Sequence, residues 1–348
     1  DISRFVLVFG CNEIGSSTMD PMLIRWSDQE SVVNWTPAIT NQAGSLPLSH
    51  GSEIVCAVQV RQEILVLTDS SVYSLQYQGP PYVWGAQLVG DNISIVSQNA
   101  AITASGAVYW MGHDKFYKYD GRVLTQHCDV QKYVFQDINF LQLNQVFAGT
   151  NEGFNEVWWF YCSAASSTVD RYVIYNYAEN VWTYGTMART AWLDAGTRVT
   201  PLAATYSNNI VSHEDGLNDN ETGTEAAIAA TITSAQFDIG DGHNFGFVWR
   251  LIPDITFSGS TAASPTATFS MNALKSSGSG YNNPESVGGE YAANVVRTTS
   301  VPVETYTGQV YVRVRGRQMS ITVESNQLDT TWQLGAPRID VRPDGRAG

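Results

Sequence analysis

Pairs of short apolar and aromatic runs, each pair joined by a polar turn, recur along the first two-thirds of the chain. Runs rich in Val, Ile, Tyr and Trp are typical of β-strands, and a short polar link between two such runs is typical of a hairpin. The pattern therefore predicts five antiparallel hairpins. Their strands are expected at 5–9 and 22–26, 64–67 and 72–77, 107–111 and 115–119, 157–161 and 172–177, and 202–206 and 210–213.

The spacing of these hairpins indicates a repeat. Their leading strands begin near residues 5, 64, 107, 157 and 202, so after a longer first interval the spacing is 43 to 50 residues. This spacing is in the range of β-propeller blades. Two of the units also place a Trp after the second strand, Trp35 and Trp182, where a third strand is expected. We therefore predict a propeller-like domain whose antiparallel blades pack through aromatic side chains, with a large sandwich as the alternative.

The pattern changes near residue 214, where residues 213–223 are polar and rich in turn-forming residues. Beyond this stretch, alternating runs at 230–238, 247–257, 267–271, 309–323 and 332–341 predict a second antiparallel domain that resembles a β-sandwich, with a Ser/Gly/Asn-rich loop at 275–289. The expected fold class is thus mostly β, with a propeller-like domain at 1–215 and a sandwich-like domain at 216–348. Because the chain begins at Asp1, we expect the N-terminal part to be incomplete.

Composition supports a folded protein. The chain is 43% hydrophobic and 15% charged and contains 10 Trp, 17 Tyr and 13 Phe, which excludes a disordered chain or a coiled coil. No apolar run has the length of about 20 residues that a membrane helix needs, so we expect no membrane span. Four cysteines lie far apart in the sequence, and we expect them to be buried free thiols: Cys11, Cys56, Cys128 and Cys162.

Charge is both negative overall and unevenly distributed. With 19 Lys and Arg against 33 Asp and Glu, the net charge of −14 repels DNA phosphates and excludes bulk capture of nucleic acid. No Lys or Arg occurs between Arg198 and Arg250, whereas that span carries seven carboxylates. Residues 313–348, by contrast, contain six Arg and four carboxylates. We expect an acidic surface from the first segment and a locally positive surface from the second.

One predicted strand carries arginines along a single face. Period-2 alternation places one set of residues on that face and a valine set on the other, namely Tyr311, Arg313 and Arg315 against Val310, Val312 and Val314. After Gly316 the apolar parity changes, which indicates either a bulge or a tight reversal at that glycine. We consider two roles for Arg313, Arg315 and Arg317: a contact with another subunit or an adaptor protein, or a solvated strand face without a partner.

No catalytic constellation is evident in the sequence. A hydrolase would need a positioned pair of carboxylates or a nucleophile motif, but there is no sialidase Asp-box, no GxSxG and no HxxxH. The acidic loop 214–221 and the turn 237–242 contain enough oxygen ligands for Ca²⁺, but neither has EF-hand spacing, and solvated acidic turns explain them better. We therefore expect no enzyme activity, and we assign no catalytic residue, metal or cofactor.

Several segments, taken in order, resemble one family, the phage stabilisation proteins of short-tailed bacteriophages, which are also described as tail nozzle or tail tubular proteins. The segments are PMLIRWSDQE at 21–30 with NWTP at 34–37, residues 68–69 through YQGPP at 77–81, YWMG at 109–112 with KFY at 115–117, and RGRQ at 315–318 with GAPR at 335–338. Together they span most of the chain.

The resemblance implies a propeller-like domain joined to a β-rich domain, with six copies forming a ring below the connector of the capsid. In that family the ring is structural: it retains packaged DNA and provides the channel for its ejection. The implied partners are other copies of the chain, the adaptor or head-to-tail connector protein, tail fibre or tailspike proteins, and double-stranded DNA that passes without sequence-specific binding. The implied location is the virion tail, assembled in the bacterial host cytoplasm.

A DNA conduit should not bind its cargo tightly, so carboxylates are suitable residues for a channel wall. We therefore expect some of the acidic residues that follow the first domain to face the channel: Glu214, Asp215, Asp219 and Glu221. The alternative function is a receptor- or glycan-binding module, such as a tail fibre head or an adhesin. Exposed Trp158, Trp159 and Trp182 would favour that alternative, whereas buried ones favour packing between blades.

Overall fold

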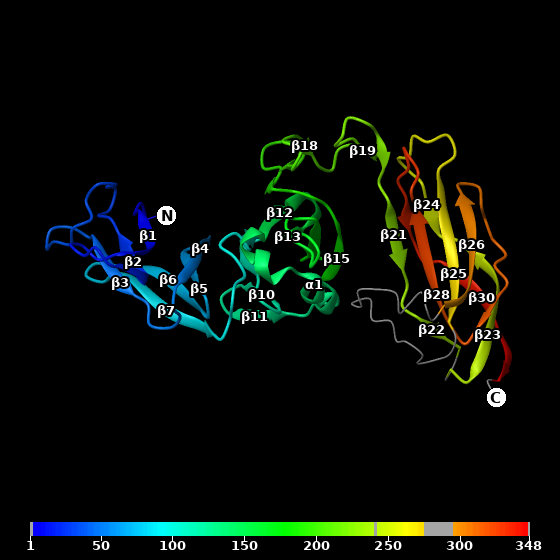
Figure 1. Ribbon diagram of the computed structural model, residues 1–348, viewed down its shortest axis with the longest axis horizontal. Coiled ribbons are helices and arrows are strands. Elements are labelled where there is room, and N and C mark those ends of the chain that lie inside the picture. The colour runs from blue at the N-terminus through cyan, green and yellow to red at the C-terminus, as the bar shows by residue number, and fades with distance from the viewer. Residues whose placement is uncertain (1–2, 240–241, 275–294, 347–348) are drawn as a thin grey trace. The chain divides into compact units, whose positions relative to one another are not determined.

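The computed structural model describes residues 3–239, 242–274 and 295–346 (Figure 1). The protein is mostly β, as predicted, and consists of many small sheets in which the paired strands run antiparallel. The chain divides into two compact units, Asp1–His213 and Glu214–Gly348. The sequence assignment placed the boundary after residue 215, within the same polar stretch.

Unit 1 forms five sheets in chain order, and in each sheet the strands lie side by side in the order in which they occur in the chain. Such meanders need only short turns, which the polar links between the apolar runs supply. The sheets are β1 to β3 (Leu7–Asn12, Met19–Trp26, Gly44–Pro47), β4 to β7 (Ile54–Val60, Glu63–Thr68, Ser71–Gly79, Val83–Asp91), β8 to β11 (Ala101–Ala104, Ala107–Met111, Phe116–Tyr119, Val123–Gln126), β12 to β15 (Phe147–Asn151, Glu156–Tyr161, Arg171–Asn176, Val181–Thr186) and β16 to β18 (Ala191–Leu193, Leu202–Ala204, Ile210–Ser212).

All five predicted hairpins are confirmed, as the pairs β1 with β2, β5 with β6, β9 with β10, β13 with β14, and β17 with β18. The sequence pattern missed most of the flanking strands, because these are half-buried and their apolar periodicity is weak. Trp182 does lie in a third strand, β15, but Trp35 lies in the loop between β2 and β3, so the expected third strand is wrong there.

Successive sheets of unit 1 pack against one another. The first strand of each sheet contacts the first strand of the next, from β1 to β4, β8, β12 and β16. Hydrophobic clusters fill the spaces between the sheet faces: one lies between the first two sheets, a large one joins the second, third and fourth, and another joins the fourth and fifth. Each of the middle sheets is therefore buried on both faces.

Aromatic side chains form much of this packing. Phe116 from the third sheet lies 4.7 Å from Trp182 and 5.0 Å from Trp159, both in the fourth sheet, measured between ring centroids. Trp158 of the fourth sheet stacks on Trp192 of the fifth at 5.0 Å. The link between the third and fourth sheets contains the helix α1 (Gln131–Asp137), with the buried Val134, and a 3₁₀ turn at Phe140–Gln145. A second 3₁₀ turn, Glu152–Phe154, joins β12 to β13 within the fourth sheet.

Unit 2 contains two larger sheets that share one hydrophobic core. The first has the order β21 (Ala230–Thr233), β28 (Gln318–Ser325), β25 (Thr266–Leu274) and β26 (Val295–Glu304), and β22 (Phe237–Asp238) also pairs with β28. The second has the order β27 (Val314–Gly316), β23 (Asn244–Ile252) and β30 (Arg338–Arg346). Val248 and Leu251 from β23 meet Phe269, Met271 and Val323 from the other sheet in the same cluster.

Two shorter pairs complete the described part of unit 2: β19 (Asn218–Asp219) with β20 (Ala226–Ala227), and β24 (Ile255–Thr256) with β29 (Gln333–Leu334). The sequence pattern did not predict β26, and the expected loop at 275–289 lies outside the described residues.

The parity change at Gly316 has a different cause from the two considered on sequence grounds. β27 ends at Gly316 in one sheet and β28 begins at Gln318 in the other, so the chain steps between sheets. The two sheets lie on opposite sides of the shared core, so β27 and β28 turn opposite faces of the chain towards it. The alternation of apolar residues therefore shifts by one position at Gly316. A Cβ at Gly316 would lie 2.9 Å from the Cβ of Ala273, which explains the glycine.

A candidate interaction surface on the C-terminal unit

The candidate site is the outer face of the sheet β27–β23–β30, together with the segment that leads into β27. In that segment Val310, Val312 and Val314 are buried in the core, with exposed fractions of 6%, 3% and 0%. Backbone hydrogen bonds between Val310 and Leu251, and from Val312 to Trp249, hold the segment beside β23. The predicted alternation is confirmed: the segment turns its valines inward and its tyrosine and arginines outward.

Strand β23 supplies the aromatic residues of this face. Gly246, Val248 and Leu251 are buried, whereas the residues between them are only half-buried. Phe247 is paired across the sheet with Arg315 of β27 on one side and Arg342 of β30 on the other. We call this surface the Arg–aromatic face and define it by Phe245, Phe247, Trp249, Arg250, Tyr311, Arg313, Arg315 and Arg342.

Cation–π contacts and stacking order the face. The Arg315 guanidinium carbon lies 4.2 Å from the ring centroid of Phe245. Trp249 has two arginines near its ring, with the guanidinium carbons of Arg250 at 4.9 Å and Arg342 at 5.3 Å. The Trp249 and Tyr311 rings stack with centroids 5.8 Å apart. Such contacts contribute about 0.5–1 kcal/mol each at exposed sites, so their main effect is to hold the side chains in place.

Two of the four arginines are also ion-paired. Arg250 directs Nη2 and Nε at Oδ2 of Asp340, at 2.5 and 2.6 Å, and Arg315 donates from Nε to Oδ2 of Asp344 at 2.6 Å. Among the described residues, Arg313 and Arg342 have no carboxylate partner. With four arginines and two aspartates, the formal charge of the face is +2 within a chain whose net charge is −14.

Arg317 does not belong to this face. It follows Gly316 in the step between the sheets, is half-buried, and donates from Nε to the backbone oxygen of Gly242 at 2.6 Å. Of the three arginines singled out from the sequence, the structure therefore brings Arg313 and Arg315 together and separates Arg317. It adds Arg250 and Arg342 and the three aromatic residues of β23. The alternation of Phe245, Phe247 and Trp249 was the sequence signal that could have identified the aromatic residues of β23.

The predicted acidic residues lie at the start of unit 2. Glu214, Asp215 and Asp219 are exposed, and Glu221 is half-buried. Asp219, in β19, accepts a hydrogen bond from the backbone N–H of Glu221 at 2.9 Å. The adjacent Asn218 is anchored to Asp329, because its amide donates to Oδ1 of Asp329 and its own Oδ1 accepts from the Asp329 backbone N–H. Whether any of these carboxylates faces a channel stays a prediction.

Metal and thiol chemistry have no assembled site in the part of the chain that the structure describes. No group of three or more His, Cys, Asp or Glu side chains is placed to hold a metal ion there. The cysteines are free thiols; Cys56, Cys128 and Cys162 are buried and Cys11 is half-buried. Burial raises the pKa of Cys56 to about 12, so this thiol stays protonated at neutral pH and is a poor nucleophile.

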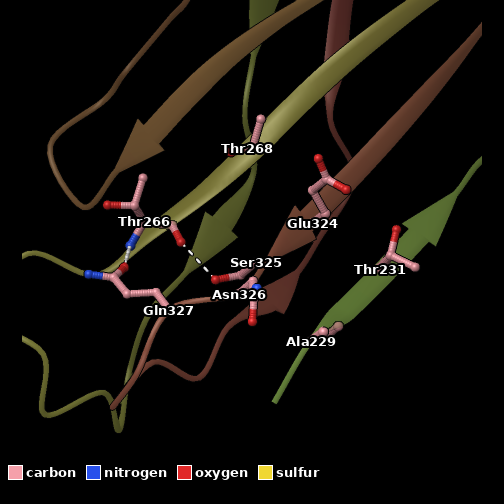
Figure 2. A pocket seen from close by; sticks show the side chains of 9 residues that line it. Ala229, Thr231, Thr266, Thr268, Glu324, Ser325, Asn326 and Gln327 are labelled. Carbon is pink, nitrogen blue, oxygen red and sulfur yellow. Dashed lines mark hydrogen bonds between the residues drawn. The ribbon is translucent and has the colours of Figure 1, made fainter. Parts of the chain in front are cut away.

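A hollow of about 600 Å³ lies over the first sheet of unit 2, which the sequence analysis missed (Figure 2). Thr231, Thr268 and Glu324 present their side chains at it, and hydrogen bonds of Thr266 with Ser325 and Gln327 fix one rim. Its remaining lining is Ala229, Ala230 and Asn326. Since none of the lining residues is aromatic, the hollow offers no platform on which a sugar ring could stack.

The three tryptophans proposed as markers of a glycan-binding face lie between sheets. Trp158 and Trp159 are buried, with exposed fractions of 6% and 1%, and Trp182 is half-buried. Their indole N–H groups are satisfied, since Trp159 donates to the backbone oxygen of Ala100 and Trp182 to that of His127. By the criterion set from the sequence, these residues favour packing between sheets.

Comparison with known proteins adds little. No protein-family model and no curated protein matches the chain. Among solved structures, the chain is similar to a complex of S. cerevisiae Dbp5 and Gle1 variants with Nup159, IP6 and ADP. The similarity has 8% sequence identity and a TM-score of 0.27, and it covers 93% of this chain and 87% of the other. A likeness at that TM-score carries no argument about fold or function.

No helix among the described residues is long and apolar enough to cross a membrane.

Proposed function

We propose that this protein is a structural virion protein whose copies assemble, through surfaces that include the Arg–aromatic face, into the tail nozzle ring of a short-tailed phage. The observation that carries the proposal is the face itself. On this face Tyr311, Arg313, Arg315 and Arg342 are exposed and Trp249 is half-buried. Trp, Tyr and Arg that are pre-ordered on a rigid sheet are the residues that dominate protein–protein binding energy. The order of the sequence segments that resemble the tail nozzle family supplies the identity of the assembly.

The fold of unit 1 agrees with this role. We infer that its five sheets are blades of a propeller-like arc, because each is a meander and because the first strands of successive sheets contact one another. We infer that unit 2 is sandwich-like, because two sheets share one core. Middle sheets that are buried on both faces through aromatic side chains resist bending, which suits a ring that retains packaged DNA.

The ring would sit below the portal and adaptor, retain packaged DNA, and provide its path for ejection without sequence-specific binding. The net charge of −14 supports a passage that does not grip DNA. Within this proposal some of Glu214, Asp215, Asp219 and Glu221 face the channel. A structure of the ring with all four on its outer wall would contradict that assignment.

The remaining partners follow from the same proposal: the adaptor or head-to-tail connector protein on one side and tail fibre or tailspike proteins on the other, in the virion tail after assembly in the host cytoplasm. Arg313 and Arg315 are exposed on the Arg–aromatic face and are available for such contacts. Arg317 is engaged with Gly242 and is the least available of the three.

The test is the native mass of the purified chain by mass spectrometry or light scattering, followed by negative-stain imaging. The expected result is a ring of six copies with a central hole. A chain that stays monomeric at its highest soluble concentration contradicts the nozzle assignment and favours the alternative, a receptor- or glycan-binding module, which would then be examined with glycan arrays.

A further inference from the structure

We propose that the Arg–aromatic face binds the acidic segment, residues 214–225, of a second copy of this chain. The inference deepens the proposed function, and rests on it, by naming which two surfaces meet in the assembly. It also goes beyond the sequence-based assignment, which left open whether the arginines contact a subunit, an adaptor or only solvent.

The face has unused binding capacity. Arg313 and Arg342 have no carboxylate partner among the described residues, and Tyr311 is 55% exposed although it stacks on Trp249. The cation–π contacts already hold Arg315 and Arg342 in place, so little side-chain entropy remains to be lost when a partner binds. A carboxylate-rich partner would find arginines that are pre-ordered for charge-assisted hydrogen bonds.

The acidic segment is the complementary surface that this chain offers. It contains five carboxylates and no Lys or Arg: Glu214, Asp215, Asp219, Glu221 and Glu225. Asp215 and Glu225 are exposed and have no ion-pair or hydrogen-bond partner within the described ranges. The segment is also fixed in shape, since the pairing of β19 with β20 and the two hydrogen bonds between Asn218 and Asp329 hold it to unit 2.

The two surfaces are different patches of the same unit. When two copies do not pair reciprocally through both patches, their contact joins unlike surfaces and leaves one of each open. Such a heterologous contact propagates until it closes into a ring or continues as a filament. This geometry is the one that a nozzle of identical copies requires. A contact between two identical patches would instead stop at a dimer.

DNA phosphates are a less suitable partner for the face. Asp340 and Asp344 lie among its arginines, and the net charge of the chain repels a polyanion at longer range. The aromatic residues favour a protein partner, because the bases of duplex DNA are stacked on one another and are not available to stack on protein side chains. The inference narrows the channel assignment, because Asp215 and Glu225, which dock on a neighbour, are not free to line a lumen.

The test uses reciprocal charge reversal in the full-length chain. The face variant carries Arg313→Glu and Arg342→Glu, and the segment variant carries Asp215→Arg and Glu225→Arg. A control with the same charge change as the face variant carries Lys115→Glu and Arg122→Glu, two exposed positions of unit 1. Each test variant should weaken self-association, measured by sedimentation velocity, by at least about tenfold in Kd, whereas the control should assemble as the unaltered chain does.

Mixing provides the decisive measurement. The face variant presents glutamates that match the arginines of the segment variant. The unaltered acidic segment of the face variant likewise matches the unaltered Arg–aromatic face of the segment variant. An equimolar mixture should therefore recover the assembly, with the two variants in equal numbers by native mass spectrometry. Circular dichroism of each variant, unchanged from that of the unaltered chain, shows that lost assembly does not come from misfolding.

The outcomes separate the two proposals. If the unaltered chain forms rings and the variants do so equally well, the inference is wrong while the nozzle assignment stands. If only the face variant fails and mixing does not restore it, the face binds something other than the acidic segment and the inference is again wrong. If the unaltered chain binds duplex DNA and the face variant does not, phosphates are the partner and the inference is overturned. A monomeric unaltered chain contradicts both proposals.

Discussion

At the scale of single residues, a half-buried carboxylate, Asp69, fixes one turn of unit 1. Asp69, at the turn between β5 and β6, accepts hydrogen bonds from the backbone N–H of Ser52 at 2.8 Å and from its hydroxyl at 2.6 Å. Burial by itself raises the pKa of Asp69, but these hydrogen bonds and others from the backbone outweigh it, and the pKa lies below its ordinary value of 3.8. The ionised form is therefore favoured in the folded protein.

This shift predicts a pH-dependent contribution to stability. Since the folded pKa is below the unfolded one, the contribution is fully present above the ordinary pKa of Asp and is lost as the pH falls through the lower folded pKa. Asp69→Asn should lower the free energy of unfolding by about 1 kcal/mol at pH 7 and by much less in acid. Urea denaturation followed by tryptophan fluorescence at several pH values measures this difference.

The matched control is Glu179→Gln, because Glu179 is exposed in the turn between β14 and β15 of unit 1 and its side chain has no hydrogen-bond partner in the described part of the chain. This control should change stability by less than about 0.5 kcal/mol at any pH. Equal urea midpoints for Asp69→Asn and the unaltered chain at pH 7 would show that the Ser52 contacts do not stabilise the turn.

At the scale of elements, the step from β27 to β28 determines which residues form the Arg–aromatic face. Gly316 permits the step because its missing Cβ leaves room for Ala273 at 2.9 Å and for the backbone oxygen of Gln318 at 3.0 Å. A longer strand without the step would carry its arginines along one sheet only. The step instead leaves Arg313 and Arg315 beside β23 and turns Arg317 towards Gly242.

Gly316→Ala should therefore destabilise unit 2. The close neighbours of an added Cβ are the Cβ of Ala273 and the backbone oxygen of Gln318, and neither can rotate away. A strand must therefore shift to relieve the clash, at a cost of about 1–3 kcal/mol. Gly308→Ala is the control, since a Cβ there meets no atom within 4 Å. Hydrogen exchange of the β25 and β28 amides measures the effect locally, and unchanged protection in Gly316→Ala would mean that the step has more room than these distances indicate.

At the scale of the whole molecule, charge is unevenly distributed, and the proposed contact between copies follows this distribution. Carboxylates dominate the start of unit 2, and arginines with aromatic residues dominate the outer face of β27, β23 and β30. The proposed contact between these two surfaces would combine ion pairs with aromatic burial. Its affinity should therefore fall with salt without vanishing.

Raising NaCl from about 0.1 M to about 1 M shortens the Debye length from about 10 Å to about 3 Å and should weaken self-association measurably. Sedimentation velocity at several salt concentrations tests this expectation. The Arg313→Glu and Arg342→Glu variant should lose most of the salt dependence together with the assembly. If association strengthens steadily with salt, apolar burial dominates the interface and the charged surfaces are not in contact.

The amino-acid sequence by itself determined the mostly β character, the five central hairpins of unit 1 and the inward-facing valines before β27. These features depend on local alternation and on polar turns, which neighbouring residues specify. Only the tertiary structure decided that β27 and β28 belong to different sheets, and that β23 and β30 bring Trp249 and Arg342 beside Arg313 and Arg315. Which strands become neighbours depends on packing between residues far apart in the chain, where local period carries no information.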